Sequence, residues 1–590
     1  MLYLRKFFSG GPDTSAEKEP NEIRRAALRY RLLDLLGCFL GGVCFAAALP
    51  PLNWNVLALI ALAPVTAVAC RSRWKFAALC GYVWGFGWSL FAFRFLREID
   101  PVIPFLMPWA ISLWPALWSA LLPFLWRNTV FPVAVELEGF DSRMRFLGSA
   151  AAFGRLLGFA AAAAALYTLI EWTRSRLFPW NDLSVTMWRD LPLIQFASFT
   201  GHFGIMFATA FFGTAVGTAA ATRFRMPGKK LLLFAAACFA LLHAAGFALY
   251  LRRAETAGKQ PANWFPAVLQ GDISQRRNAD IGEAREALEV YLTLSREAMT
   301  ADPKPDLVIW PESAVPVPFR AAHPVSTLFR TGIRMLTYAY HVPMLIGAID
   351  FQDPLPVDGR DLKVTNSALH FDETGKLRRK YDKIHRVPFG EYVPFRAFLP
   401  EFVIRRIDMN RDLAPGTDFD PVPLGKNVRA GVAICYEGIF SYLTRAFALR
   451  GANVLVVISN DAWYPTSSEP EQHLANAVMR AVETGLPMVR CGNNGGSLVV
   501  LPTGEITQIL EVPGPEKRLE LRRGRGFRKL AVHVPDHPAP TFFVRFGEWI
   551  LLVLAIGCAA WWGLAVRSFV ARKRFFRQKL DAAGTSEGEA

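Results

Sequence analysis

Cysteine is scarce in the polar part of this chain. Six of the eight cysteines lie in or beside apolar segments, where we expect small core residues: Cys38, Cys44, Cys70, Cys80, Cys238 and Cys558. Only Cys435 and Cys491 lie in the polar stretch 252–542, which excludes a disulfide framework, and their spacing is not that of a metal site. A single bond between them stays open, but we expect Cys435 to be a free thiol, because a disulfide would consume the nucleophile described below.

The chain also lacks the pattern of a cleavable signal peptide. Residues 1–31 are polar and basic, and the first apolar run, 32–50, is longer than a signal core and leads into another span. Acidic residues do not balance the basic ones: 50 Asp and Glu stand against 66 Lys and Arg, for a net charge of +16. The basic clusters fall mostly in short loops beside apolar runs, so we expect a membrane protein with no nucleic-acid partner.

Apolar residues are abundant. They make up 52% of the chain, which includes 46 Phe and 17 Trp, and the mean hydropathy is +0.23. Each apolar run is near the length of about 20 residues that a helix needs to cross a bilayer. We predict about eight transmembrane helices, at 32–50, 55–70, 76–96, 104–126, 150–172, 192–221, 231–251 and 543–566.

Loop charge orients these spans. Lys and Arg gather before the first span and after the second, fourth, sixth and last, so we expect those sides to be cytoplasmic. The predicted organisation is a cytoplasmic tail (1–31), a seven-helix membrane domain (32–251), an extracytoplasmic domain (252–542), a last span (543–566) and a second cytoplasmic tail (567–590).

In the stretch 252–542, short β-rich runs alternate with amphipathic ones, which predicts an α/β layered sandwich. The expected strands are 264–270, 306–310, 343–349, 367–371, 428–434, 453–458, 488–491 and 497–501, and the expected helices are 281–300, 324–340, 439–450 and 470–485. The long apolar loop 396–420 is either a lid that meets lipid or an ordinary surface loop.

Three residues in this stretch are the parts of an activated cysteine nucleophile. Cys435 ends the apolar strand AGVAI, Glu312 follows the strand of DLVIWPES, and Lys383 opens KIHRVPFGEY. Glu312 is the candidate base, and Lys383 is the candidate cation for a thiolate or an oxyanion. Two further carboxylates, Glu391 and Glu437, could orient Lys383 and bind a substrate amine. Each residue taken singly is also explained as a surface ion-pair residue or a core thiol.

Histidines offer alternatives. His385, two residues from Lys383, invites a Cys–His dyad, but we favour a structural hydrogen bond. We expect His473 to be a helix residue near the rim of the site.

Several ordered motifs resemble the nitrilase (carbon–nitrogen hydrolase) superfamily. They are WPESAVP around Glu312, YDKIHRVPFGEYVPF around Lys383 and Glu391, ICYE at Cys435, VLQGDISQ, SNDAWY, EQHLANAVMRAVETGLP and RCGNNG. With the flanking spans and EWTRSRLFPW at 171–180, the chain resembles the apolipoprotein N-acyltransferases of bacterial envelopes. This resemblance implies an αββα-sandwich nitrilase-like domain on a polytopic α-helical membrane domain.

The resemblance also implies roles for single residues. Glu312 matches the general base, Lys383 the catalytic lysine and Cys435 the nucleophile. Four further residues match positions that the family needs: Glu391, Tyr436, Glu437 and Trp180. Two places depart from its pattern, Ala279 where the family often has Trp and the Tyr464–Pro465 pair after SNDAW, which bears on substrate fit rather than on bond-making.

The implied reaction moves a fatty acyl chain from a membrane phospholipid, with phosphatidylethanolamine as the expected donor, through a cysteine thioester. The expected acceptor is the N-terminal amine of diacylglyceryl-cysteine in an apolipoprotein. We expect a monomer in the bacterial inner membrane, with a periplasmic catalytic domain and no metal or other cofactor. Two alternatives remain: a membrane-anchored amidase or nitrilase acting on a small amide, and a transporter or receptor that binds a ligand without chemistry.

Overall fold

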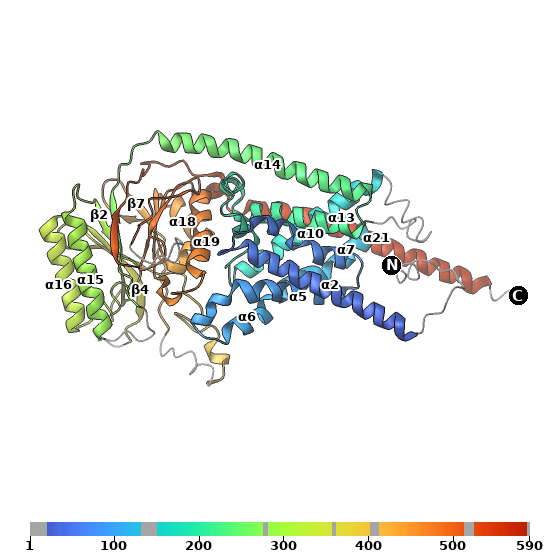
Figure 1. The fold of residues 1–590 in the computed structure, drawn as a ribbon, viewed down its shortest axis with the longest axis horizontal. Coiled ribbons are helices and arrows are strands. Elements are labelled where there is room, and N and C mark those ends of the chain that lie inside the picture. The colour runs from blue at the N-terminus through green and yellow to red at the C-terminus, as the bar shows by residue number, and fades with distance from the viewer. Residues whose placement is uncertain are drawn as a thin grey trace. The chain divides into compact units, whose positions relative to one another are not determined.

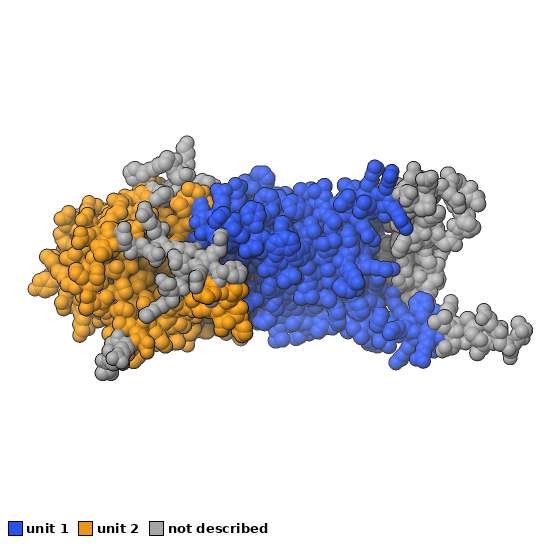
Figure 2. Space-filling model, turned by 90° about the horizontal axis from the view of Figure 1, so that it is seen from below, with its two compact units in different colours: residues 1–187, 203–244, 548–590 blue, residues 188–202, 245–547 orange. Residues whose placement is uncertain are grey.

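The computed structural model describes residues 20–130, 150–274, 281–356, 361–401, 412–512 and 524–586. Ala279, the middle of the loop 396–420 and most of the N-terminal tail lie outside the described residues. The chain divides into two compact units, coloured separately in Figure 2. The first comprises Met1–Met187, Phe203–Ala244 and Glu548–Ala590, and the second comprises Trp188–His202 and Ala245–Gly547.

The first unit is helical. Its longer helices are α2 (Pro20–Ala48), α5 (Trp74–Ala92), α6 (Ile103–Ile111), α7 (Leu113–Thr129), α10 (Ala150–Ser175), α13 (His202–Ala221), α14 (Met226–Gly258) and α21 (Trp549–Ser586). By length and composition, six helical segments among the described residues can cross a membrane, and they correspond to six of the eight predicted spans. The predicted polytopic helical part is therefore confirmed.

The other two predicted spans are shorter. The run at 55–70 is broken into α3 (Ala58–Ala61) and α4 (Ala63–Ala69). A proline stands in the first turn of α4, where it fits the start of a helix but not its interior. The run at 76–96 is helix α5, nineteen residues long.

The span predicted over 192–221 is wrong as a single helix. The run contains α11 (Leu191–Ile194), α12 (Ala197–Thr200) and then α13, and Gly201 with φ +65° separates the last two. Glycine adopts this left-handed conformation at low cost and so ends a helix within an otherwise apolar run. Hydropathy alone cannot detect such a break.

The second unit is an αββα sandwich, as the resemblance implied (Figure 1). One sheet has the order β12-β1-β2-β3-β4-β5 and the other β11-β10-β9-β8-β7-β6. The strands are β1 (Pro266–Gln270), β2 (Leu307–Ile309), β3 (Met344–Phe351), β4 (Val364–Phe371), β5 (Leu377–Asp382), β6 (Val422–Pro423), β7 (Arg429–Ile434), β8 (Val454–Ser459), β9 (Met488–Gly492), β10 (Leu498–Val500), β11 (Ile506–Thr507) and β12 (Gly526–Lys529). Helices α15 (Ile281–Thr300) and α16 (Pro324–Tyr340) form one outer layer, and α18 (Ser441–Leu449) and α19 (Glu469–Thr484) the other.

Parallel strands form the middle of each sheet. Strands β1, β2 and β3 run parallel, as do β7, β8 and β9. They are buried almost throughout, which explains their continuous apolar runs, of which VLVVIS in β8 is typical. Because parallel strands end at the same edge of a sheet, residues that follow β7, β8 and β9 are brought together there.

All eight predicted strands and all four predicted helices of this stretch are confirmed within a few residues. The four strands that the sequence did not predict are β5, β6, β11 and β12, and these are the four edge strands of the two sheets. Edge strands are often short or charged, because an apolar edge would pair with other chains. The sequence of β5, LRRKYD, shows this property.

Candidate active site

The turn after β7 positions Cys435. The apolar strand ends at Ile434, and the 3-10 turn Cys435–Ile439 begins directly after it. Cys435 has φ +53°, in the left-handed region that few non-glycine residues adopt. Such strained residues occur at functional sites, where the surrounding structure holds them in place. Both Cys435 and Cys491 are free thiols.

Glu312 and Lys383 form a buried ion pair. The Lys383 Nζ atom donates to Glu312 Oε1 at 3.0 Å, and the two residues are 1% and 7% exposed. Glu312 follows β2, and Lys383 comes directly after β5, so the first sheet supplies both. The other oxygen of Glu312 accepts the backbone N–H of Asn460 at 3.0 Å. This bond ties the base to the segment that follows β8, in the sheet that carries Cys435.

Glu391 is the second partner of Lys383. Its Oε1 atom accepts from Lys383 Nζ at 2.9 Å, and its Oε2 atom accepts the N–H of Val387 at 2.8 Å. The side chain of Asn366, on β4, donates to Glu312 Oε1 at 2.7 Å and to Glu391 Oε1 at 3.0 Å. The ammonium is thus held between two carboxylates, and one amide fixes both of them.

Charges and burial decide the protonation of this group. Burial raises the pKa of the Cys435 thiol well above its usual range, Glu312 raises it further, and Lys383 lowers it. Burial alone would lower the pKa of Lys383, but Glu312 and Glu391 outweigh that effect and raise it well above its ordinary value. The resting site therefore holds a thiol beside a permanent ammonium, and the thiol needs a base at the moment of attack.

The Glu437 carboxylate accepts hydrogen bonds from the backbone next to Lys383 and from the backbone next to Cys435. Its carboxylate accepts from the N–H groups of Ile384, His385 and Ile434, at 2.7, 2.9 and 2.8 Å, and from the Tyr381 hydroxyl at 3.0 Å. These donors flank Lys383 on one strand and Cys435 on the other. Glu437 is fully buried, and burial raises its pKa to about 7. The sequence predicted that one of the two carboxylates, Glu391 or Glu437, orients Lys383 and the other binds a substrate amine. In the structure, Glu391 contacts Lys383, whereas Glu437 holds the backbone next to Lys383 and next to Cys435.

Tyr436 and His385 lie beside the turn and pack together. Their rings are 5.9 Å apart, and both contact Phe440, with His385 at 3.7 Å. His385 Nδ1 is bonded to the Tyr442 hydroxyl at 3.0 Å. Burial, followed by Lys383, lowers the pKa of His385 to about 4. These contacts fit the structural hydrogen bond that the sequence favoured for His385.

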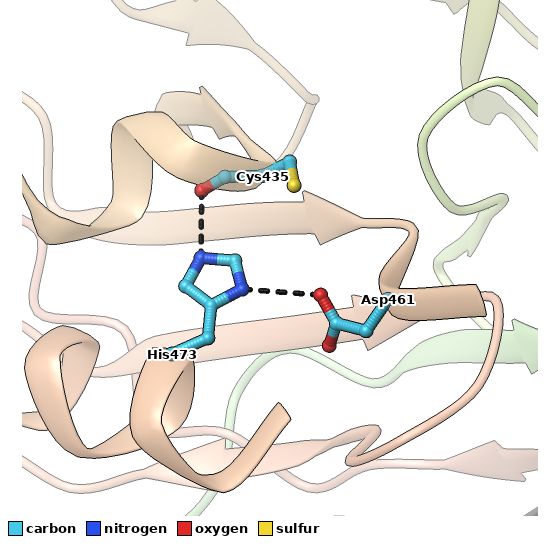
Figure 3. Close-up of side chains that lie close together, drawn as sticks. All are labelled: Cys435, Asp461 and His473. Atoms are coloured by element: carbon cyan, nitrogen blue, oxygen red, sulfur yellow. Dashed lines mark hydrogen bonds and ion pairs between the residues drawn. The ribbon is translucent and has the colours of Figure 1, made fainter. Parts of the chain in front are cut away.

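A second polar group lies behind Cys435 (Figure 3). His473, on α19, contacts the carbonyl oxygen of Cys435 through Nε2 at 3.0 Å and Asp461 Oδ1 through Nδ1 at 3.1 Å. Arg490, in the middle of β9, donates to the other oxygen of Asp461. The ligand-type atoms of Cys435, Asp461 and His473 lie within 4.8 Å of one another. Both imidazole nitrogens and the carboxylate are already engaged, and Arg490 adds a positive charge, so this donor set does not suit a metal ion.

Trp180 belongs to the first unit. It is 5% exposed, its ring centroid lies 5.7 Å from that of Phe95, and its carbonyl accepts from Arg174 Nη1 at 3.1 Å. Arg174 also donates to Glu171 and to the carbonyl of Phe178. The segment EWTRSRLFPW is therefore fixed by its own buried arginine.

The sequence did not single out Asn366, Asn460 or Asp461. Nothing in the sequence identifies Asn366 as a site residue, because an Asn in a strand does not indicate that its side chain contacts two carboxylates. Asn460 and Asp461 stood inside the quoted motif SNDAWY, and that motif was the signal that they lie near the site. His473 was expected at the rim, but it is 1% exposed and contacts the nucleophile's own backbone.

Comparison with known proteins covers both units. Residues 41–215 match the model of the apolipoprotein N-acyltransferase N-terminal domain, and residues 267–512 match that of carbon-nitrogen hydrolases. An apolipoprotein N-acyltransferase of Geobacter metallireducens is 32% identical over 92% of this chain and 96% of that relative. Proteins of the same name from Bdellovibrio bacteriovorus and Rhizobium leguminosarum are 29% and 33% identical, over 76% and 62% of this chain and 79% and 69% of their own.

The helical unit and the αββα unit, with the Glu312–Lys383 pair beside Cys435, are thus matched along nearly the whole chain by one kind of protein. This extent and identity place the chain in a family, and it belongs to the apolipoprotein N-acyltransferases.

Proposed function

We propose that this chain is a lipoprotein N-acyltransferase that works by a ping-pong mechanism through Cys435. Family membership supports acyl transfer. The observation that carries the mechanism is the buried Glu312–Lys383 ion pair, 3.0 Å long, whose two charges both act on the Cys435 thiol. The catalytic triad is Glu312, Lys383 and Cys435, with Glu391 and Glu437 in support.

The first half-reaction forms a thioester. Glu312 takes the thiol proton as the sulfur of Cys435 attacks the ester carbonyl of a phospholipid. The oxyanion that develops on the carbonyl oxygen is stabilised by the Lys383 ammonium, which Glu391 holds in place. The carbon–oxygen bond then breaks, the leaving alkoxide takes the proton back from Glu312, and a lysophospholipid departs.

The second half-reaction passes the acyl group to an amine. The N-terminal amine of diacylglyceryl-cysteine on an apolipoprotein attacks the thioester and gives a proton to Glu312. The carbon–sulfur bond breaks, and the thiolate of Cys435 recovers that proton. Neither half-reaction requires a metal or a redox cofactor. Excluding water from the site would favour the amine over hydrolysis.

The setting follows from the substrates and the loop charges. Both substrates are lipids, so an enzyme with membrane-spanning helices meets them without extracting them from the bilayer. Phosphatidylethanolamine is the proposed donor. Basic residues before the first span and after the last support cytoplasmic termini and a catalytic domain in the periplasm of a bacterial inner membrane. We take the working unit to be a monomer.

Intact mass spectrometry tests this proposal directly. Wild type and Cys435→Ala are purified in detergent and incubated with phosphatidylethanolamine. We expect a fatty-acyl adduct on wild type alone, removed by hydroxylamine as a thioester is. Addition of a diacylglyceryl lipopeptide should discharge the adduct and yield the N-acylated peptide.

Two results would redirect the proposal. An adduct that is discharged by water and never by the lipopeptide would make the chain an amide or ester hydrolase. Untouched phospholipid and an unmodified enzyme would remove lipid acyl transfer altogether.

A further inference from the structure

The polar group behind Cys435, formed by His473, Asp461 and Arg490, takes no part in either proposed half-reaction. His473 and Asp461 are each 1% exposed and Arg490 is fully buried, so none of them meets a substrate. Buried charged groups are costly unless they are paired. They come from α19, from the turn after β8 and from β9, and His473 joins the group to the backbone of the nucleophile.

Hydrogen-bond chemistry defines the state of His473. Its Nε2 atom faces the carbonyl oxygen of Cys435, which can only accept. Its Nδ1 atom faces Asp461 Oδ1 at 3.1 Å, nearer than Arg490 Nη2 at 3.4 Å. The other oxygen of Asp461 binds Arg490, which keeps this carboxylate ionised and so an acceptor as well. The Nε2 atom therefore carries a proton and donates it to the Cys435 carbonyl, while Nδ1 is enclosed by Asp461, Arg490 and Glu469, the last at 3.9 Å.

The left-handed turn explains why this contact matters. The φ angle of +53° sets the directions in which the Cβ atom and the carbonyl carbon of Cys435 leave its Cα atom. Figure 3 shows the carbonyl oxygen of Cys435 bonded to the imidazole, and the sulfur lies within 4.8 Å of one imidazole nitrogen. Holding the carbonyl therefore holds the backbone from which the Cβ–Sγ bond extends. A buried hydrogen bond to this carbonyl helps to keep the strained backbone in place, because the oxygen would otherwise be an unpaired buried acceptor.

We propose that His473, held in place by Asp461 and Arg490, is a positioning residue that aims Cys435 by binding its backbone carbonyl oxygen. It acts only through Cys435 and takes no proton from the thiol. The inference rests on the proposed function, because it concerns the rate at which Cys435 is acylated.

Two substitutions of similar polarity separate this role from general support. In His473→Gln the side-chain amide reaches about as far as Nε2 and can donate to the Cys435 carbonyl. In His473→Asn the amide reaches only about as far as Nδ1, so it can meet Asp461 but not Cys435. We expect the acylation rate of the Gln variant to stay within about fivefold of wild type. The rate of the Asn variant should fall by about 10- to 100-fold, because the Cys435 carbonyl is then left as an unsatisfied buried acceptor.

The measurement is the rate of thioester formation on full-length protein in detergent, over a range of phosphatidylethanolamine concentrations. The half-saturating concentration should not change in either variant, because His473 touches no substrate. His370→Gln is the matched control: it replaces another buried histidine of the same unit, on β4, and should acylate as wild type does. Melting temperatures are recorded for all proteins.

The outcomes are distinct. Equal rates for Gln and Asn, or rates that simply follow the melting temperature, would make His473 a structural residue and overturn the inference. A change in half-saturation without a change in maximal rate would also overturn it. Failure of wild type itself to form a thioester would instead count against the proposed function.

Discussion

At the scale of single residues, Glu437 shows how one side chain can serve two strands. Its carboxylate binds the N–H groups that follow Lys383 and the N–H that precedes Cys435. The lysine and the nucleophile lie 52 positions apart in the sequence and on different sheets. A fully buried acceptor with four donors is expensive to lose, because each unpaired N–H would remain without solvent.

Glu437→Gln should therefore damage both stability and catalysis. The new amide group keeps one acceptor oxygen and turns an NH₂ toward a backbone N–H. We expect a loss of about 1–3 kcal/mol in the free energy of unfolding, the usual cost of an unsatisfied buried polar group. Thermal unfolding in detergent at pH 8 measures it, and Glu373→Gln, at an exposed turn, is the control.

The pH dependence has a definite sign. The pKa of Glu437 is raised to about 7 in the folded protein from an ordinary 4.5. The folded state therefore binds the Glu437 proton more tightly than the unfolded state does. The stabilisation that this proton gives is fully present below pH 4.5 and is lost as the pH rises through 7. The stability gap between wild type and Glu437→Gln should narrow over that range. A gap that widens with rising pH would contradict this assignment.

At the scale of elements, β3 is shaped to receive the segment that carries Glu312. That segment crosses the strand so closely that Val315 exchanges backbone hydrogen bonds with Gly347 and Ile349. A Cβ atom on Gly347 would lie 2.1 Å from the carbonyl oxygen of Pro311 and 2.7 Å from the Cα of Glu312. A glycine within a strand marks such a close approach of another backbone.

Gly347→Ala should displace the candidate base Glu312 while leaving its carboxylate chemically unchanged. Rigid backbone atoms must give way, and small displacements of catalytic groups can cost on the order of 100-fold in rate. We expect the thioester to form that much more slowly, with a loss of about 1–3 kcal/mol in stability from overpacking. Gly526→Ala, on the edge strand β12, meets no backbone atom but only the side chains of Val512 at 3.1 Å and Leu510 at 3.9 Å, so it should change the rate little. A normal rate in Gly347→Ala would show that Glu312 tolerates the shift.

At the scale of the whole molecule, two apolar segments of the chain enclose one polar one. Helix α14 ends at Gly258, and the αββα unit follows it to Gly547, where α21 begins two residues later. The segment 222–230, which includes the start of α14, carries Arg223, Arg225, Lys229 and Lys230, whereas the last turns of α14 carry Arg252 and Arg253 beside Glu255. From the positive-inside rule we expect the two ends of α14 to lie on opposite sides of the membrane, with its start in the cytoplasm.

Reporter fusions check this orientation. Alkaline phosphatase, which is active only outside the cytoplasm, should be active when fused after Lys259 and inactive when fused after Arg225. A fluorescent protein that folds in the cytoplasm should give the opposite result at these two sites and should fluoresce at the C-terminus. The matched fusions differ only by α14. Activity of the phosphatase at Arg225 would reverse the proposed topology.

The sequence by itself predicted six of the helical segments that can cross a membrane, the parallel core strands and the proposed trio of Glu312, Lys383 and Cys435, because each leaves a local signal. Long apolar runs, continuous buried strands and charged residues at strand ends are all visible along the chain. The sequence did not predict the edge strands β5, β6, β11 and β12, because they are short or charged. It also did not predict the break at Gly201, because that break depends on a single φ angle.

Only the tertiary structure decided how the polar residues divide the work. Glu391 and Glu437 are alike in sequence, but one binds an ammonium and the other binds backbone N–H groups. In the sequence, His473 is simply a histidine on an amphipathic helix. Only the fold shows that it contacts the carbonyl of Cys435. The physical reason is that a hydrogen bond depends on where its partner lies, and these partners come from distant strands that only the packed sheets bring together.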